Sequence, residues 1–239
     1  MRFVWPLILA GLLTGCVFED SGRLRYRMTV EVDTPAGVRN GSSVIESTIT
    51  KGPGFGDASG ISYGLRAEAV AVDLPGSRNL YALLRSQGDG DTAGYHARLV
   101  QGAACGNGAP SARPDPSFCK PGSWREFRRW TQSTELKVTL APEDYPLLVT
   151  FRDVRDPKSV VRVDPGDLAA TFGPGTRLRA ITVAVTDEPV TTDIEKQFSW
   201  WARYQSRQFD DTSTVSEDLT TNYLAAHLSS GSFSTALYN

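Results

Sequence analysis

Hydrophobic and polar residues alternate in the first part of the chain that follows the N-terminal apolar segment. Five apolar residues fall on one face, at Leu24, Tyr26, Met28, Val30 and Val32, and the residues between them are charged or polar. Such alternation predicts a half-buried β-strand. Residues 34–41 contain Pro, Gly and Asn, and residues 44–50 are rich in β-branched side chains. This order predicts a hairpin with a second strand.

Similar strand patterns recur through the chain, and no long helix is expected between them. They cover residues 66–72, 79–84, 135–140, 147–151, 160–163 and 179–185. Short strands separated by turn residues predict a mainly β fold. We expect an antiparallel β-sandwich or open barrel of about seven to eight strands with a few short helices. An α+β two-layer arrangement is the alternative.

Helical patterns are short. Thr192 and Glu195 have the spacing of a capping box, and Ile194, Phe198 and Trp201 follow at helical spacing. Two further short helices are expected at 123–131 and 217–228. Beyond Gln208 the chain is rich in Ser, Thr and Asp. We therefore expect a single β-rich domain at 23–208 and a loosely packed tail with a short helix at 209–239.

The N-terminal segment is typical of an export signal. Arg2 precedes an apolar run at residues 3–13, which is shorter than the roughly 20 residues that a transmembrane helix needs. The sequence that ends in Cys16 is Leu-Thr-Gly-Cys, which resembles the lipobox of bacterial lipoproteins. That resemblance implies cleavage after residue 15, lipid on Cys16 and a tether at 16–22. A plain secretory signal with a chance cysteine is the alternative.

The residue after the lipidated cysteine bears on the location of the protein. Val17 stands where an Asp usually marks retention at the inner membrane in enteric lipoproteins. By this analogy we expect the periplasmic face of the outer membrane. Membrane attachment would then depend on the lipid at Cys16.

The cysteine count suggests one disulfide. With Cys16 carrying lipid, Cys105 and Cys119 form a pair at the ends of a segment rich in Gly and Pro. A bridge across a loop of about 15 residues stabilises a protein by roughly 3 kcal/mol in an oxidising compartment. Metal ligation is the alternative, although the chain has only two His and no CxxC pair. We expect no metal and no cofactor.

Charge and composition narrow the function classes. The 239 residues include 25 Lys and Arg against 27 Asp and Glu, which gives a net charge of −2. We therefore expect no nucleic-acid partner. His96 and His227 are the only histidines, and the chain has no GxSxG or HExxH motif. A hydrolase of the envelope that uses His96 as its general base is nevertheless the alternative to a non-catalytic protein.

Aromatic and basic residues cluster twice, at 124–130 and 198–207, and the clusters hold four of the five Trp. On a helix, Trp200 lies about 100° around the axis from Trp201, so one indole should be exposed. Trp200, Arg203 and Arg207 form the candidate ligand surface, with an envelope protein or a glycan as the partner. The alternative is a short amphipathic helix that only covers a sheet.

Two stretches, 26–46 and 145–196, resemble an uncharacterised proteobacterial protein family. The resemblance includes the turn sequences Asp-Pro-Gly-Asp-Leu at 164–168 and Phe-Gly-Pro-Gly at 172–175. No activity is assigned to that family, so the resemblance supports one folded unit and transfers no site residue. The sequence predicts a lipid-anchored protein of the cell envelope with a non-catalytic binding or scaffolding role.

Overall fold

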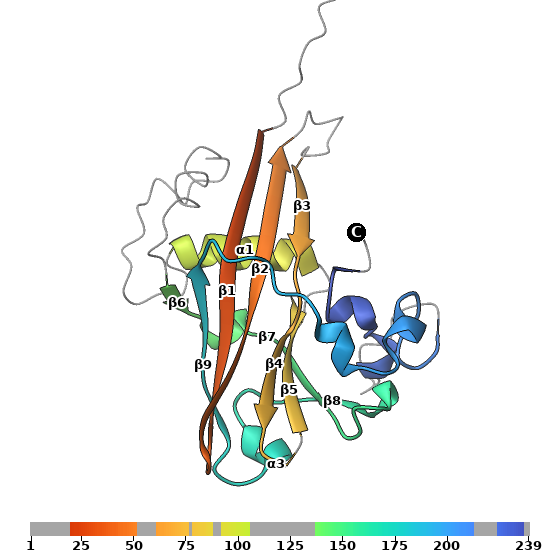
Figure 1. The fold of residues 1–239 in the computed structure, drawn as a ribbon. Helices are drawn as coiled ribbons and strands as arrows, with labels where there is room; N and C mark the ends of the chain where they lie inside the picture. Colours follow the sequence, from red (N-terminus) through yellow and green to blue (C-terminus); the bar gives the residue numbers. More distant parts are fainter. Residues whose placement is uncertain are drawn as a thin grey trace, which may run out of the picture.

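The computed structural model describes residues 20–51, 61–76, 78–87, 92–105, 137–212 and 224–236. In these parts of the chain, two antiparallel sheets form a β-sandwich (Figure 1). The five-stranded sheet has the order β3-β2-β1-β9-β6, and the four-stranded sheet has the order β4-β5-β7-β8. The predicted mainly β sandwich is confirmed.

The strands other than β3 lie close to the predicted positions, whereas β3 occupies a stretch for which no strand was expected. The five-stranded sheet contains β1 (Asp20–Thr34), β2 (Gly37–Lys51), β3 (Ile61–Arg66), β6 (Lys137–Thr139) and β9 (Arg177–Val185). The four-stranded sheet contains β4 (Val70–Leu74), β5 (Arg78–Ser86), β7 (Pro146–Phe151) and β8 (Val160–Arg162). The described α-helices are α1 (Thr92–Cys105) and α3 (Leu168–Phe172). Short 3-10 turns are η1 (Pro142–Asp144), η2 (Pro157–Ser159), η3 (Ile194–Gln197), η4 (Trp201–Tyr204), η5 (Leu224–Ala226) and η6 (Ser230–Ser232).

The β1–β2 hairpin is built as the alternation predicts. The five apolar residues that alternate along β1 are buried between the sheets, and its arginines lie on the opposite face. Thr34 pairs with Gly37 across a turn of two residues. Gly37 has a φ of 104°, a left-handed conformation that glycine adopts without steric cost. The hairpin turn is therefore tighter than the sequence suggests.

The four-stranded sheet is buried on both faces. Along β5, Leu80, Ala82 and Leu84 belong to the core between the sheets, whereas Tyr81 and Leu83 belong to a second core on the other side. A strand covered on both faces has a continuous apolar sequence, as β5 has. The molecule therefore has a third layer beyond the sandwich.

The C-terminal segment provides this third layer. Phe209, Leu228 and Phe233 are fully buried against the outer face of the four-stranded sheet. Ala69 and Phe233 are joined by a main-chain hydrogen bond of 2.7 Å. This packing corrects the expectation of a loosely packed tail, as far as residues 209–212 and 224–236 are concerned.

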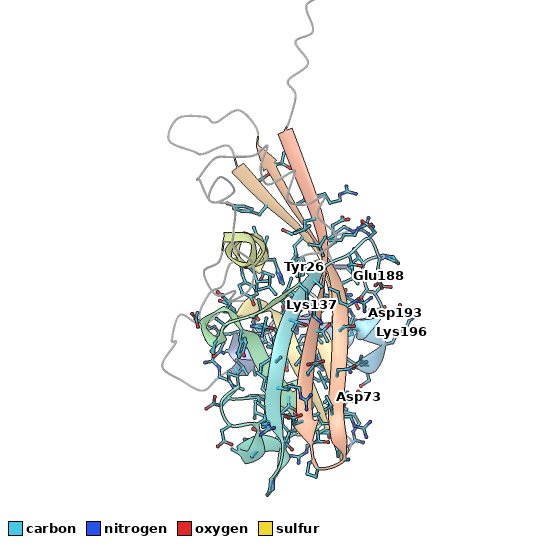
Figure 2. All side chains as sticks on the ribbon, turned by 90° about the vertical axis from the view of Figure 1, so that its left-hand side faces the viewer. Tyr26, Asp73, Lys137, Glu188, Asp193 and Lys196 are labelled. Carbon is cyan, nitrogen blue, oxygen red and sulfur yellow. The ribbon has the colours of Figure 1, made fainter. Side chains whose placement is uncertain are left out.

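The chain reaches this layer by crossing the outer face of the five-stranded sheet after β9. Glu188 forms an ion pair with Arg27 of β1, and Val44 of β2 donates a main-chain hydrogen bond of 2.8 Å to Thr191 Oγ1. Figure 2 shows Glu188 and Asp193 on the side of this sheet opposite to α1. The crossing places residues 194–204 over the four-stranded sheet.

The helix predicted from the capping box is not continuous. Residues 194–204 form the turns η3 and η4, which Phe198 interrupts with an extended backbone. The cap comes from Glu68, whose carboxylate accepts main-chain hydrogen bonds of 3.0 and 2.9 Å from Asp193 and Ile194. A carboxylate from a distant segment has replaced the local cap that Thr192 was expected to supply.

Helix α1 is a helix that the sequence analysis did not foresee. It lies behind β1 and β2 at the level where β3 ends (Figure 1) and buries Tyr95, His96 and Leu99. Gly94 and Gly102 lower the helix propensity of this segment, so its local pattern is weak. Packing against β5, β3 and β2 stabilises it instead.

Several predicted features lie outside the described residues. They are the signal peptide at 1–15, the lipid attachment residue Cys16, Cys119 of the expected disulfide and the helix at 123–131. Most of the helix expected at 217–228 is outside as well, and only η5 is described there. In the part of the chain that the structure covers, no helix is long and apolar enough to cross a membrane.

Candidate functional site

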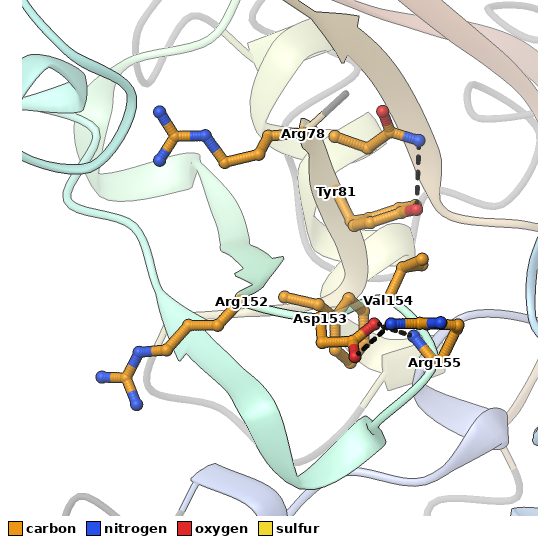
Figure 3. A pocket seen from close by; sticks show the side chains of 8 residues that line it. Arg78, Tyr81, Arg152, Asp153, Val154 and Arg155 are labelled. Carbon is orange, nitrogen blue, oxygen red and sulfur yellow. Dashed lines mark hydrogen bonds and ion pairs between the residues drawn. The ribbon is translucent and has the colours of Figure 1, made fainter. Parts of the chain in front are cut away.

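A pocket of about 380 Å³ lies where β5 begins and β7 ends (Figure 3). This volume is in the usual range of small-molecule sites. The pocket is lined by Arg78, Asn79, Tyr81, Phe151, Arg152, Asp153, Val154 and Arg155. Three arginines thus surround a partly aromatic wall, and we take this pocket as the candidate site.

The β7–β8 connection positions most of the pocket residues. Arg152 donates a main-chain hydrogen bond of 3.2 Å to the carbonyl oxygen of Ser159. The Ser159 hydroxyl accepts one of 3.0 Å from the Asp153 amide and lies 2.8 Å from the Asp153 carbonyl oxygen, to which it donates. One serine therefore fixes both sides of this loop, so the charged side chains project from a defined backbone.

Arg155 and Asp153 form an ion pair inside this loop. The Nε and Nη2 atoms of Arg155 both lie 3.1 Å from carboxylate oxygens of Asp153. These hydrogen bonds hold the pKa of Asp153 below its usual value. The carboxylate is therefore ionised at neutral pH and neutralises one of the three guanidinium groups.

Arg78 is held by the C-terminal end of α3. Its guanidinium donates hydrogen bonds of 2.7 Å to the Thr171 carbonyl and 3.3 Å to the Phe172 carbonyl. The group also lies 5.6 Å from the centre of the Phe172 ring, over its face. A cation at the last carbonyls of a helix is a favourable arrangement. Arg78 is thereby fixed at the edge of the pocket.

Arg152 has no hydrogen-bond or ion-pair partner for its guanidinium among the described residues. Figure 3 shows its side chain extending to the same side as that of Arg78, while Arg155 turns toward Asp153. Counting three arginines and one aspartate, the pocket carries two net positive charges. It is therefore suited to an anion, and Arg152 is the group with free hydrogen-bond donors.

The wall of the pocket is aromatic and hydrogen-bonded. The rings of Tyr81 and Phe151 meet edge to face with centres 5.8 Å apart. The Tyr81 hydroxyl donates a hydrogen bond of 3.3 Å to Gln197 Oε1 of the third layer. Burial raises the pKa of Tyr81. The phenol is therefore neutral at pH 7, and the wall adds no negative charge.

The ligand surface predicted from the sequence does not form as expected. Trp200 is 7% exposed and Trp201 is 8% exposed, so the expectation that one indole reaches the surface is wrong. Arg203 binds Asp211 at 2.9 Å, and among the three predicted residues only Arg207 is exposed without a partner in the described chain. The interrupted helix explains the difference, because two short turns bury both indoles where one continuous helix could not.

His96 is also placed differently from what its suggested catalytic role requires. It is 0% exposed and shares a hydrogen bond between its Nδ1 and the Tyr26 hydroxyl. Burial lowers its pKa to about 4, an effect that the Leu84 backbone partly opposes. The ring is therefore neutral at pH 7 but has no contact with solvent. This position removes the support for His96 as a general base.

The pocket was not found by the sequence analysis, although one signal was available. The segment Arg-Asp-Val-Arg-Asp-Pro at 152–157 places two arginines in a short connection between predicted strands. The contribution of Arg78 depends on the pairing of β5 with β7, which no local pattern reveals. Within the described residues, no group of three or more His, Cys, Asp or Glu is arranged to hold a metal ion.

The chain was compared with protein families, curated proteins and solved structures. No family model, no curated protein and no solved structure matches the chain.

Proposed function

We propose that this chain is a lipid-anchored protein of the cell envelope that binds an anionic ligand without catalysis, in the pocket around Arg152. The observation that carries the proposal is the free guanidinium of Arg152 in a pocket with two net positive charges and an aromatic wall. The ligand would be the acidic group of an envelope glycan or protein. Charge-assisted hydrogen bonds from arginine recognise carboxylates and phosphates well.

The chemistry of the pocket favours binding. A guanidinium group stays protonated at all physiological pH values, so it holds an anion but does not exchange protons. Asp153 is ionised and occupied by Arg155, and its pKa is lowered by that contact. These side chains can therefore orient and retain a charged ligand.

Attachment through Cys16 is the second part of the proposal. It is supported by the short apolar run at 3–13 and by the Leu-Thr-Gly-Cys sequence that follows. Two or more acyl chains anchor a protein stably, whereas one chain alone is marginal. The proposed location is the periplasmic face of the outer membrane.

Membrane fractionation tests the anchor. The mature chain is exported behind a cleavable secretory signal, with Cys16→Ser, and compared with the natural precursor. The natural form should sediment with membranes after a high-salt wash, and the variant should be soluble in the periplasm. A variant that stays in the membrane pellet would show that the lipid is not the anchor.

Ligand binding tests the pocket. We would titrate soluble mature protein with a muropeptide, a small carboxylate-bearing fragment of peptidoglycan, and separately with inorganic phosphate. Arg152→Gln should weaken binding of the preferred probe by about 10-fold or more, as expected for loss of charge-assisted hydrogen bonds. Arg207→Gln is the matched control, because it removes an exposed arginine outside the pocket. Equal affinity of both variants and the wild type would contradict the proposal.

A further inference from the structure

We infer that the pocket lies at the membrane-distal end of the domain, and that its ligand is an acidic cell-wall polymer rather than a lipid of the anchoring membrane. This inference rests on the proposed function, because it needs the anchor at Cys16 and an anion-binding pocket. It adds that the ligand reaches the pocket from the side of the domain that faces away from the anchoring membrane. The protein would then connect its membrane to the cell wall.

The anchor and the start of the domain are close together. Strand β1 begins at Asp20, four residues after Cys16. Four residues span at most about 14 Å when fully extended. The end of the sheet where β1 begins is therefore held at the membrane surface.

The other end of β1 is far from the anchor. The strand has 15 residues and runs to Thr34. At about 3.3 Å per residue this corresponds to roughly 45 Å. Such a distance is several times the Debye length of about 8 Å at physiological ionic strength. Charges at the far end are thus electrostatically separated from headgroups at the anchor when β1 points away from the membrane.

The pocket lies at that far end. Pro35 follows β1 and packs against Gly175, where an added Cβ would come within 2.9 Å of the proline ring. Gly175 follows α3, and the carbonyls of α3 hold Arg78 of the pocket. Figure 1 shows α3 at the bottom of the molecule and the beginning of β1 at the top.

A polymer network can reach this position more easily than the headgroups of the anchoring membrane. The tether is shorter than the domain, so the pocket can meet that membrane only if the domain lies flat on it. A cell-wall polymer with carboxylates would also present many ligands to each anchored protein. Once the lipid holds the protein at the membrane, the effective concentration of the pocket near the cell wall is raised.

Two labelling positions test the orientation directly. Val154 is 42% exposed at the pocket. Tyr63 is 48% exposed and pairs with Ile49, which pairs with Gly22 near the start of β1. Full-length lipidated protein with Cys105→Ser and Cys119→Ser would carry a donor dye on Val154→Cys or on Tyr63→Cys. It is reconstituted into phosphatidylcholine vesicles that contain an acceptor lipid.

Energy transfer to the membrane should be several-fold stronger from position 63 than from position 154. Equal transfer from both positions would overturn the inference, because it would show that the domain lies flat. This readout needs no ligand. Failure of the orientation is thus distinguishable from failure of the anion pocket, which the muropeptide titration decides.

A capture experiment tests the source of the ligand. Vesicles that carry the unlabelled lipidated protein should sediment with purified peptidoglycan sacculi, and Arg152→Gln should reduce the sedimented fraction several-fold. Anionic phosphatidylglycerol added to the same vesicles should leave the capture unchanged. If phosphatidylglycerol abolishes the capture, or if sacculi capture no vesicles, the assignment of the ligand to the cell wall is wrong.

Discussion

The indole nitrogen of Trp200 donates a hydrogen bond of 2.7 Å to the main-chain carbonyl oxygen of Val154. Val154 belongs to the pocket loop, and Trp200 is stacked on Phe198 in the third layer with ring centres 4.5 Å apart. The aromatic cluster therefore supports the loop that presents Arg152 and Arg155. Trp200 was expected to contact the ligand, but it instead holds the main chain of the pocket loop at Val154.

This contact predicts different effects for the two neighbouring tryptophans. Trp200→Phe should lower the stability by about 1 to 3 kcal/mol through the lost hydrogen bond, and it should also weaken ligand binding. Trp201→Phe, the matched control, removes a similar volume without that bond and should leave the affinity unchanged. Urea unfolding and muropeptide titration of both variants measure the two quantities. Equal muropeptide affinities of the Trp200→Phe and Trp201→Phe variants would show that the hydrogen bond from Trp200 to Val154 does not support the pocket.

The buried His96 predicts a specific pH dependence of stability. Burial lowers its folded-state pKa from 6.5 to about 4, so the unfolded chain binds a proton first as the pH falls. The free energy of unfolding should therefore decrease between pH 6.5 and pH 4, by up to about 3 kcal/mol from this residue. Below pH 4 the contribution should change no further.

Substitution isolates this effect from other titrating groups. His96→Gln keeps a polar partner for Tyr26 but does not titrate in this range. The stability difference between wild type and variant should shrink or reverse as the pH falls from 6.5 to 4, because only the wild type loses stability through His96. If the stability of the wild type and of the variant fell in parallel over this pH range, His96 would not be the source of the pH dependence.

At Gly41, β2 lies so close to β4 of the other sheet that there is no room for a side chain. A Cβ on this residue would lie only 1.9 Å from the Ala71 carbonyl oxygen of β4. Gly41→Ala should therefore destabilise the protein by about 1 to 3 kcal/mol, the usual effect of overpacking. In Gly64→Ala, the added Cβ would lie 3.5 Å from Thr48, which is ordinary contact. Thermal unfolding should show a lower midpoint for the first variant only.

The pairing of Cys105 with Cys119 stays a prediction from the sequence. Peptide mass analysis of non-reduced protein, purified from the periplasm, should show the two cysteines linked. Loss of the bridge should lower the unfolding midpoint and leave the fold intact, because both described cores lie elsewhere in the chain. Two free thiols in the exported protein would reject the bridge.

The fold was predictable because its signals are local. Alternation along β1 and the apolar run of β5 specify strands, and turn residues specify where they end. Strand β3 was not predicted, and two other parts of the fold could not be predicted from local patterns. Helix α1 is stabilised by packing, and the turns at 194–204 depend on a cap from Glu68, which is distant in the sequence.

The candidate site was less predictable, because it depends on contacts between distant segments. Arg78 and Arg152 come together only through the pairing of β5 with β7. The aromatic cluster around Trp200 was visible in the sequence, but its burial was not, since the break at Phe198 changes which sides of the turns face the sheet. Composition identified residues of interest without indicating which of them reach solvent.

An NMR titration of isotopically labelled mature protein with the muropeptide shows directly whether the pocket around Arg152 binds the ligand. We expect the amide shifts to change most for Asn79 and for residues 152–155, and we expect Arg152→Gln to abolish these changes at the same ligand concentration. Shift changes centred on Arg203 and Arg207, or the same changes in the Arg152→Gln variant, would contradict ligand binding in this pocket.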